Sequence, residues 1–173
     1  IVRGDWRSDG GTAGVITVCS AGTAAGLFAS LTGGAQAGGT WTAPGGGAFS
    51  GTYDPTTDAP GVYTYTVAGT APCPNDQAIV TVAETVPPNA GTDGVITFCS
   101  TGATAGLFAS LAGGAEAGGT WTAPGGGAFS GSYDPAVNAP GVYTYTVTGT
   151  APCPNDQATV TVAETAPPNA GTD

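Results

Sequence analysis

The sequence GVYTYTV occurs twice in the chain, as Gly61–Val67 and as Gly141–Val147. Side chains in a strand point alternately to its two faces, so Tyr63, Tyr65 and Val67 share one face, and a valine and two threonines share the other. An aromatic face backed by β-branched residues is typical of a half-buried strand. This stretch therefore predicts a β-strand with its tyrosines turned towards a core.

Both copies of this strand belong to a longer repeat. With a shift of 80 positions, residues 11–90 align with residues 91–170 without gaps, and 14 of the 80 aligned positions differ. The last three residues, 171–173, match residues 91–93. We therefore expect residues 1–10 to be the end of a preceding module or a linker, residues 11–90 and 91–170 to be two modules, and residues 171–173 to begin a third copy.

The rest of each repeat also has the pattern of short strands. In QAIVTVAE, Val80 and Val82 share one predicted inward face, and Ile79, which becomes Thr159 in the second repeat, lies on the other. Further strands are expected at residues 14–20, 39–43 and 48–54, with a Pro-Gly turn at 44–47. Residues 25–31, AGLFASL, suit either a buried strand or one helical turn, and we favour the strand.

Six or seven short strands, with turn residues every 8 to 12 positions, predict an all-β fold made of antiparallel β-sandwich modules. At about 80 residues, each module is near the lower size limit for an adequate hydrophobic core. Such a module benefits from a covalent crosslink.

Four cysteines could supply these crosslinks, because each repeat has two at the same spacing: Cys19 with Cys73, and Cys99 with Cys153. Pairing within each repeat is the simplest of the three connectivities and would stabilise each module by roughly 4 kcal/mol on the chain-entropy model. Disulfides imply an oxidising compartment. The alternative is four buried free thiols.

The charge of the chain excludes several classes of function. Twelve acidic residues against two basic ones give a net charge of −10, and both arginines lie before residue 11. Nucleic acid binding needs a basic surface, so we expect none. We expect no membrane insertion either, since no apolar run has the length of a spanning helix. Without histidine and with no lysine, the chain has few candidates for catalytic bases, and we predict that it is not an enzyme.

The motifs GGTWTAPGG, YDP followed by APGVYTYTV, APCPNDQATVTV and PPNAGTDG together resemble the immunoglobulin-like repeats of large Bacteroidetes (Flavobacteriia-type) surface and secreted proteins. These adhesin-like proteins are associated with gliding and type 9 secretion. The resemblance implies tandem immunoglobulin-like modules at an extracellular or cell-surface location. It implies no catalytic residues.

Two sets of residues are candidates for binding. Trp41 and Trp121 could stack against sugar rings, although core packing is the favoured alternative. Glu84, Asn89 and Asp93 could hold calcium at the joint between modules, although solvated surface charge is favoured. We expect no obligatory cofactor.

The sequence thus predicts a structural repeat region of an extracellular stalk, fibre or filament. Its expected partners are neighbouring repeats and other fibre subunits. The alternative is an adhesive module that binds a host or cell-surface glycan. A glycan array would separate the two, because binding abolished by Trp41→Ala and Trp121→Ala would favour the adhesive module.

Overall fold

A computed structural model describes residues 9–169 and 171 of the chain. These residues form two compact units. The first holds residues 9–86 together with Ala151–Cys153, and the second holds Pro87–Thr150 and the described residues from Pro154 onward. Ala151–Cys153 belongs to the second repeat in sequence but to the first unit in structure.

The first unit consists of seven strands and one short 3₁₀ turn. They are β1 (Gly14–Cys19), β2 (Ala25–Gly26), the turn η1 (Leu27–Ser30), β3 (Thr40–Thr42), β4 (Ala48–Phe49), β5 (Thr52–Tyr53), β6 (Gly61–Val67) and β7 (Asp76–Thr85).

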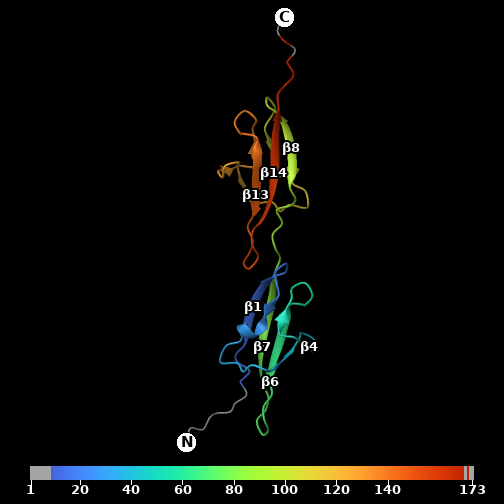
Figure 1. Cartoon of the computed structure of the whole chain (residues 1–173), viewed down its shortest axis with the longest axis vertical. Helices are drawn as coiled ribbons and strands as arrows, with labels where there is room; N and C mark the ends of the chain where they lie inside the picture. Colours follow the sequence, from blue (N-terminus) through green and yellow to red (C-terminus); the bar gives the residue numbers. More distant parts are fainter. Residues whose placement is uncertain (1–8, 170, 172–173) are drawn as a thin grey trace. The chain divides into compact units, whose positions relative to one another are not determined.

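Five of these strands form one sheet in the order β1-β7-β6-β3-β4, and β2 pairs with β5 in a small second sheet. The ten-residue β7 lies between β1 and β6, as Figure 1 shows. β6 and β7 are antiparallel, but β1 and β7 are parallel, with Gly14 opposite Val80 and Cys19 opposite Thr85. The sequence predicted antiparallel sheets, so this parallel pair is a departure from that prediction.

The alternating pattern of the Tyr strand is confirmed by the structure. Tyr63, Tyr65 and Val67 of β6 are buried. On β7, Val80 and Val82 are buried and Ile79 is exposed, as expected. Since both strands turn their apolar faces the same way, they form one wall of the core.

Aromatic rings from the two sheets meet in this core. Tyr53 of β5 packs edge-on against Tyr63 of β6, with ring centroids 5.7 Å apart, and Phe49 packs against the same Tyr63 ring at 4.5 Å. Such tilted and edge-to-face pairs are the favoured geometry for aromatic contacts. Leu27 fills the space beside them and is fully buried.

The buried tyrosines also satisfy backbone groups through their hydroxyls. The Tyr63 hydroxyl donates to the carbonyl of Ala59 at 2.8 Å. The Tyr65 hydroxyl donates to the carbonyl of Gln36 at 2.6 Å and accepts from the Gly39 N–H at 2.8 Å. Each phenol therefore supplies apolar area to the core and ties a neighbouring loop to the sheet.

The second unit repeats the same elements. They are β8 (Gly94–Cys99), β9 (Ala105–Gly106), the turn η2 (Phe108–Ser110), β10 (Thr120–Thr122), β11 (Ala128–Phe129), β12 (Ser132–Tyr133), β13 (Gly141–Val147) and β14 (Asp156–Thr165). The sheet order is β8-β14-β13-β10-β11 with β9 paired to β12, and β8 is again parallel to β14. Equal sequences thus give equal topologies.

The structure corrects the favoured interpretation of residues 25–31. Only Ala25–Gly26 is a strand, and the next four residues form η1, which ends where the Leu31 N–H donates to the carbonyl of Phe28. The turn buries Leu27 and leaves Phe28 partly exposed. A 3₁₀ turn separates these two side chains, and a local apolar pattern of this length does not distinguish it from a strand.

Asp9 and Gly10, which the sequence assigned to a preceding module or a linker, are hydrogen-bonded to the first unit. The Gly10 N–H donates to the carboxylate of Asp76 at 2.6 Å, and the Asp9 carbonyl accepts from the Gln36 N–H at 2.9 Å. Asn89 makes the equivalent backbone contact in the second repeat, with the Glu116 N–H at 2.8 Å. The second compact unit begins at Pro87. Residues 1–8, and the predicted third copy apart from Gly171, lie outside the described residues.

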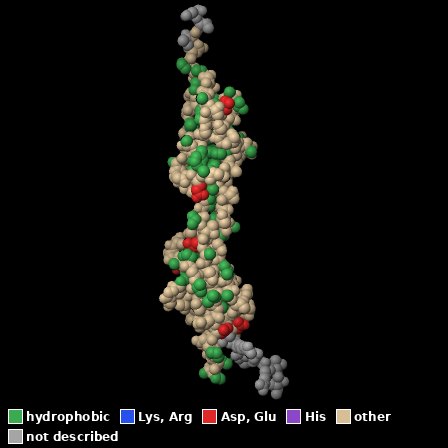
Figure 2. Space-filling view, turned by 180° about the vertical axis from the view of Figure 1, so that it is seen from behind, with side chains coloured by type: hydrophobic (Ala, Val, Ile, Leu, Met, Phe, Trp, Pro, Cys, Tyr) green, Lys and Arg blue, Asp and Glu red, His purple; other side chains and the backbone are tan. Residues whose placement is uncertain are grey.

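The surface of both units carries acidic side chains. Figure 2 shows Asp and Glu side chains on each unit. The sequence has neither lysine nor arginine from residue 9 onward. Neither 3₁₀ turn in the described part of the chain, nor any other helix there, is long and apolar enough to cross a membrane.

Replacing Tyr65 with Phe tests the hydroxyl's structural role. Tyr65→Phe removes the hydroxyl that bonds to the Gln36 carbonyl and to the Gly39 N–H, so we expect the free energy of unfolding to fall by about 1–3 kcal/mol. Urea unfolding measures this change. Val62→Thr, on the exposed face of the same strand, is the matched control and should change it by no more than about 0.5 kcal/mol. An equal effect of the two substitutions would contradict the assigned role.

Candidate functional site

The candidate site lies at the carboxyl end of β1, where the strand places Cys19 beside the end of β7. Cys19 is opposite Thr85, and the chain then turns away: the Ser20 N–H donates to the Thr85 carbonyl at 2.9 Å, and the Gly22 N–H donates to the Cys19 carbonyl at 2.8 Å. Cys19 is 7% exposed. The parallel pairing with β7 therefore fixes where this sulfur lies.

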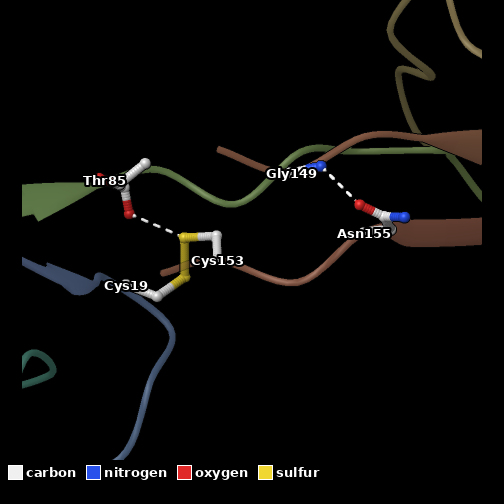
Figure 3. Close-up of a disulfide and its surroundings, with 5 residues drawn as sticks. All are labelled: Cys19, Thr85, Gly149, Cys153 and Asn155. Atoms are coloured by element: carbon white, nitrogen blue, oxygen red, sulfur yellow. Dashed lines mark hydrogen bonds between the residues drawn. A yellow bond between two sulfur atoms is a disulfide. The ribbon is translucent and has the colours of Figure 1, made fainter. Parts of the chain in front are cut away.

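Cys153 supplies the second half of the site. It forms a disulfide with Cys19, with a Cα–Cα distance of 4.9 Å that lies within the usual range. Its sulfur is 3.2 Å from the carbonyl oxygen of Thr85, as Figure 3 shows, and the residue is 5% exposed. The bond joins residues 134 positions apart, so it links the first repeat covalently to the second.

The predicted pairing within each repeat is therefore wrong. Cys19 pairs with Cys153, whereas Cys73 and Cys99 are exposed free thiols. The alternative of four buried free thiols is wrong as well.

The geometry of β7 explains why Cys19 cannot pair with Cys73. Cys19 lies beside Thr85 at the last residue of β7, and Cys73 precedes Asp76 at the first residue. Nine steps along a strand span about 30 Å, whereas the Cα atoms of a disulfide lie within about 7 Å. An antiparallel pairing would have brought the two cysteines to the same end of the sheet. No signal in the sequence distinguished the two pairings.

The loop that carries Cys153 is held in shape by a hydrogen bond within the loop. The Gly149 N–H donates to the side-chain oxygen of Asn155 at 3.0 Å, which closes the loop between β13 and β14 (Figure 3). The loop between β6 and β7 makes the same bond, from Gly69 to Asn75, at 3.0 Å. A Cβ atom at Gly69 would lie 2.1 Å from the carbonyl oxygen of Pro74, so glycine is needed there.

The two candidate sugar-binding tryptophans, Trp41 and Trp121, lie in the cores rather than on an open surface. Trp41 and Trp121 are 9% and 8% exposed, and each indole packs on a β-strand tyrosine, Tyr65 or Tyr145, at a centroid distance of 4.9 Å. Gly51, with φ at +88°, brings its backbone against the indole of Trp41. This burial agrees with the core-packing alternative, because a sugar ring needs an uncovered indole face.

The three predicted calcium ligands already have hydrogen-bond partners. Glu84 accepts from the Tyr53 hydroxyl at 2.6 Å in the first unit. In the second unit, the Asn89 side chain donates to the carbonyl of Gly113 at 2.9 Å, and Asp93 accepts from the Thr159 N–H at 2.7 Å. Among the described residues, no group of three or more acidic or cysteine side chains is placed to hold a metal ion. Calcium at the joint stays a prediction.

The Tyr53–Glu84 contact is the main electrostatic feature of the first unit. Burial of the phenol, and then its hydrogen bond to the Glu84 carboxylate, raise the pKa of Tyr53 well above its ordinary value of 10. The Tyr133–Glu164 pair reproduces the contact at 2.6 Å and raises the pKa of Tyr133 for the same reasons. Each pair anchors the small sheet to the end of the last strand of the large one.

Fold and site together define a class of protein. β7, β6 and β3 correspond to strands G, F and C of an immunoglobulin-like sandwich, with β2 and β5 as the facing B and E strands. The Tyr63 hydroxyl bonds to the backbone four residues upstream, as the tyrosine corner of that fold does. The chain therefore consists of immunoglobulin-like all-β modules with a disulfide.

The chain was compared with protein-family models, curated proteins and solved structures, and it is similar to solved structures alone. No protein-family model and no curated protein matches the chain. A three-immunoglobulin-domain structure of titin is 14% identical with a TM-score of 0.45, and the match covers 90% of this chain and 64% of that one. The insect immune protein hemolin is 12% identical with a TM-score of 0.44, and the match covers 93% of this chain and 46% of that one. The chain thus spans less than two thirds of the length of either structure.

Peptide mapping without reduction checks the disulfide. After native protein is alkylated, we expect a peptide that joins Cys19 to Cys153, while Cys73 and Cys99 carry the alkyl group. The same digest after reduction serves as the control, since all four cysteines should then be alkylated. A peptide joining Cys19 to Cys73 would contradict the assignment.

The raised pKa of Tyr53 predicts a loss of stability in base. A tyrosine whose pKa is higher in the folded state than in the unfolded state contributes stability below about pH 10, and that contribution is lost as the pH rises towards the folded value. Urea midpoints between pH 8 and pH 11 should therefore fall, and they should fall less steeply in Tyr53→Phe. Identical slopes for the two proteins would contradict the prediction.

Proposed function

We propose that the chain is a structural repeat region of an extracellular stalk or fibre. In this region, successive immunoglobulin-like modules are joined both by the backbone and by a disulfide. The observation that carries this proposal is the Cys19–Cys153 disulfide, which adds a second covalent link between repeats to that of the backbone. A module that only presents a binding surface has no need of such a link.

The position of the disulfide suits a chain under tension. A pull on the two ends passes along the backbone to Cys19, crosses the sulfur bridge to Cys153 and leaves through the last residues. The residues between the cysteines, which include most strands of both units, are bypassed. Unfolding can then release only the residues outside the bridge.

The backbone connection between the repeats supports the same role. It contains Pro87 and Pro88, and consecutive prolines favour a stiff, extended backbone. The second unit begins at Pro87. A stiff joint and a disulfide both limit the freedom of one module against the next.

The disulfide and the charge of the chain support an extracellular location. Disulfides persist mainly in oxidising compartments. The repeats combine a strong excess of acidic residues with neither histidine nor lysine, which favours a solvated surface over a catalytic site. We propose a secreted or surface-exposed protein without enzymatic activity, whose partners are neighbouring repeats and other fibre subunits.

Single-molecule force measurements test this proposal. When the chain is pulled from its two ends, the oxidised protein should extend roughly 450 Å less than the reduced protein, because the two cysteines are 134 positions apart and each position spans about 3.4 Å of extended chain. Cys153→Ser should behave like the reduced protein, and Cys73→Ser, which removes a free thiol, should behave like the oxidised one. Equal extension of oxidised and reduced protein would overturn the load-bypassing role.

A further inference from the structure

Two cysteines remain unpaired although their counterparts are joined. Cys99 occupies in the second repeat the position that Cys19 occupies in the first, and Cys73 occupies in the first repeat the position of Cys153. Cys19 and Cys153 are bonded and buried, whereas Cys73 and Cys99 are free and exposed. Each repeat therefore uses one of its cysteines and leaves the other open.

The strand end around Cys99 has the structure of the occupied site. Cys99 is opposite Thr165, just as Cys19 is opposite Thr85. The Ser100 N–H donates to the Thr165 carbonyl at 2.9 Å, and the Gly102 N–H donates to the Cys99 carbonyl at 2.7 Å. These bonds match the corresponding ones at Cys19 to within 0.1 Å. The strand-end half of such a disulfide site is therefore already present around Cys99.

The loop around Cys73 is likewise a match for the loop that bonds to Cys19. Residues 69–78 and 149–158 have identical sequences, and both loops are closed by a glycine-to-asparagine hydrogen bond of 3.0 Å. In the Cys73 loop, the Cys73 N–H also donates to the Thr70 carbonyl at 2.9 Å. The loop half of such a disulfide site is therefore present around Cys73 of the first repeat.

We propose that Cys73 and Cys99 are crosslinking sites for further copies of this repeat, with Cys99 bonding to the loop cysteine of a following copy and Cys73 to the strand-end cysteine of a preceding one. This inference rests on the proposed function and names the partner: another repeat of the same sequence type. The pairing is head to tail, because each joint takes one strand end and one loop. Such heterologous contacts do not close on themselves and generate open-ended chains.

The chemistry of the joint is thiol–disulfide exchange with a small-molecule or protein disulfide as oxidant. A thiolate at Cys99 attacks one sulfur of the oxidant, forms a mixed disulfide and releases a thiolate. The loop cysteine of the next copy then attacks the Cys99 sulfur and releases the second thiolate. Two thiols of the repeats and one oxidant disulfide thus become one disulfide between repeats and the two thiols of the reduced oxidant.

The surroundings of Cys99 favour the first step. Its sulfur lies 3.3 Å from the hydroxyl of Thr101, and this side-chain hydrogen bond, followed by one from the backbone, lowers the pKa of the thiol. A lower pKa raises the thiolate fraction at neutral pH, and the exposed sulfur is accessible to an oxidant.

A three-repeat chain tests the proposal. A further copy of residues 91–170 is joined after residue 170, and the chain is oxidised in a glutathione redox buffer and mapped without reduction. We expect Cys99 to bond to the second cysteine of the added copy, leaving Cys73 and the first cysteine of that copy free. The backbone tether gives this pair the raised effective concentration that Cys19 and Cys153 share.

The Cys19–Cys153 bond in the same molecules is the internal control, because its presence shows that oxidation and folding succeeded. Cys99→Ser is the matched variant, and it should leave the second cysteine of the added copy open to alkylation. A free Cys99, or a Cys99 bonded to any other cysteine, in molecules that contain the Cys19–Cys153 bond would overturn the inference. The proposed function would survive that result, since the force measurement on the two-repeat chain tests it separately.

Discussion

The parallel pairing of β1 with β7 is the constraint on which most of this structure depends. β7 is hydrogen-bonded to β1 on one side and to β6 on the other, and its ten residues run the length of the sheet. Because β1 runs in the same direction, Cys19 lies at the end where β7 finishes, far from the loop where β7 starts. One choice of strand direction therefore separates the two cysteines of a repeat and turns them towards different partners.

The core is consistent with this division of roles. In a sandwich of the immunoglobulin type, a disulfide between the sheets can hold the core together. Here that place is taken by tyrosines, whose rings pack against one another and whose hydroxyls bind loop carbonyls. The rings contribute buried area, and the hydroxyls reduce the number of unpaired backbone groups. The two sheets of each unit are thus held together by buried tyrosines and not by a disulfide between the sheets.

The same arrangement explains why the two units tolerate their sequence differences. Ile79 is replaced by Thr159 on the exposed face of the last strand, while Val80 and Val82 have identical counterparts in the core. Asp9 and Asn89 differ in charge, yet the side-chain oxygen of each accepts from the N–H two residues later, at 2.7 and 2.8 Å. At these two positions the fold needs only a strand-forming residue or a polar oxygen.

The sequence by itself determined the repeat, the all-β class and the inward faces of the long strands. These features are local or periodic: the alternation of Tyr63 and Tyr65 depends only on strand geometry, and the 80-residue period depends only on sequence identity. The short elements do not follow from a local pattern alone: residues 27–30 form a 3₁₀ turn, whereas their apolar pattern favours a strand. Only the tertiary structure decided the cysteine pairing and the burial of Trp41, because both depend on which strands are neighbours and in which direction they run. Equal spacing within each repeat shows that Cys19 and Cys73 recur together, but it carries no information about their distance in space.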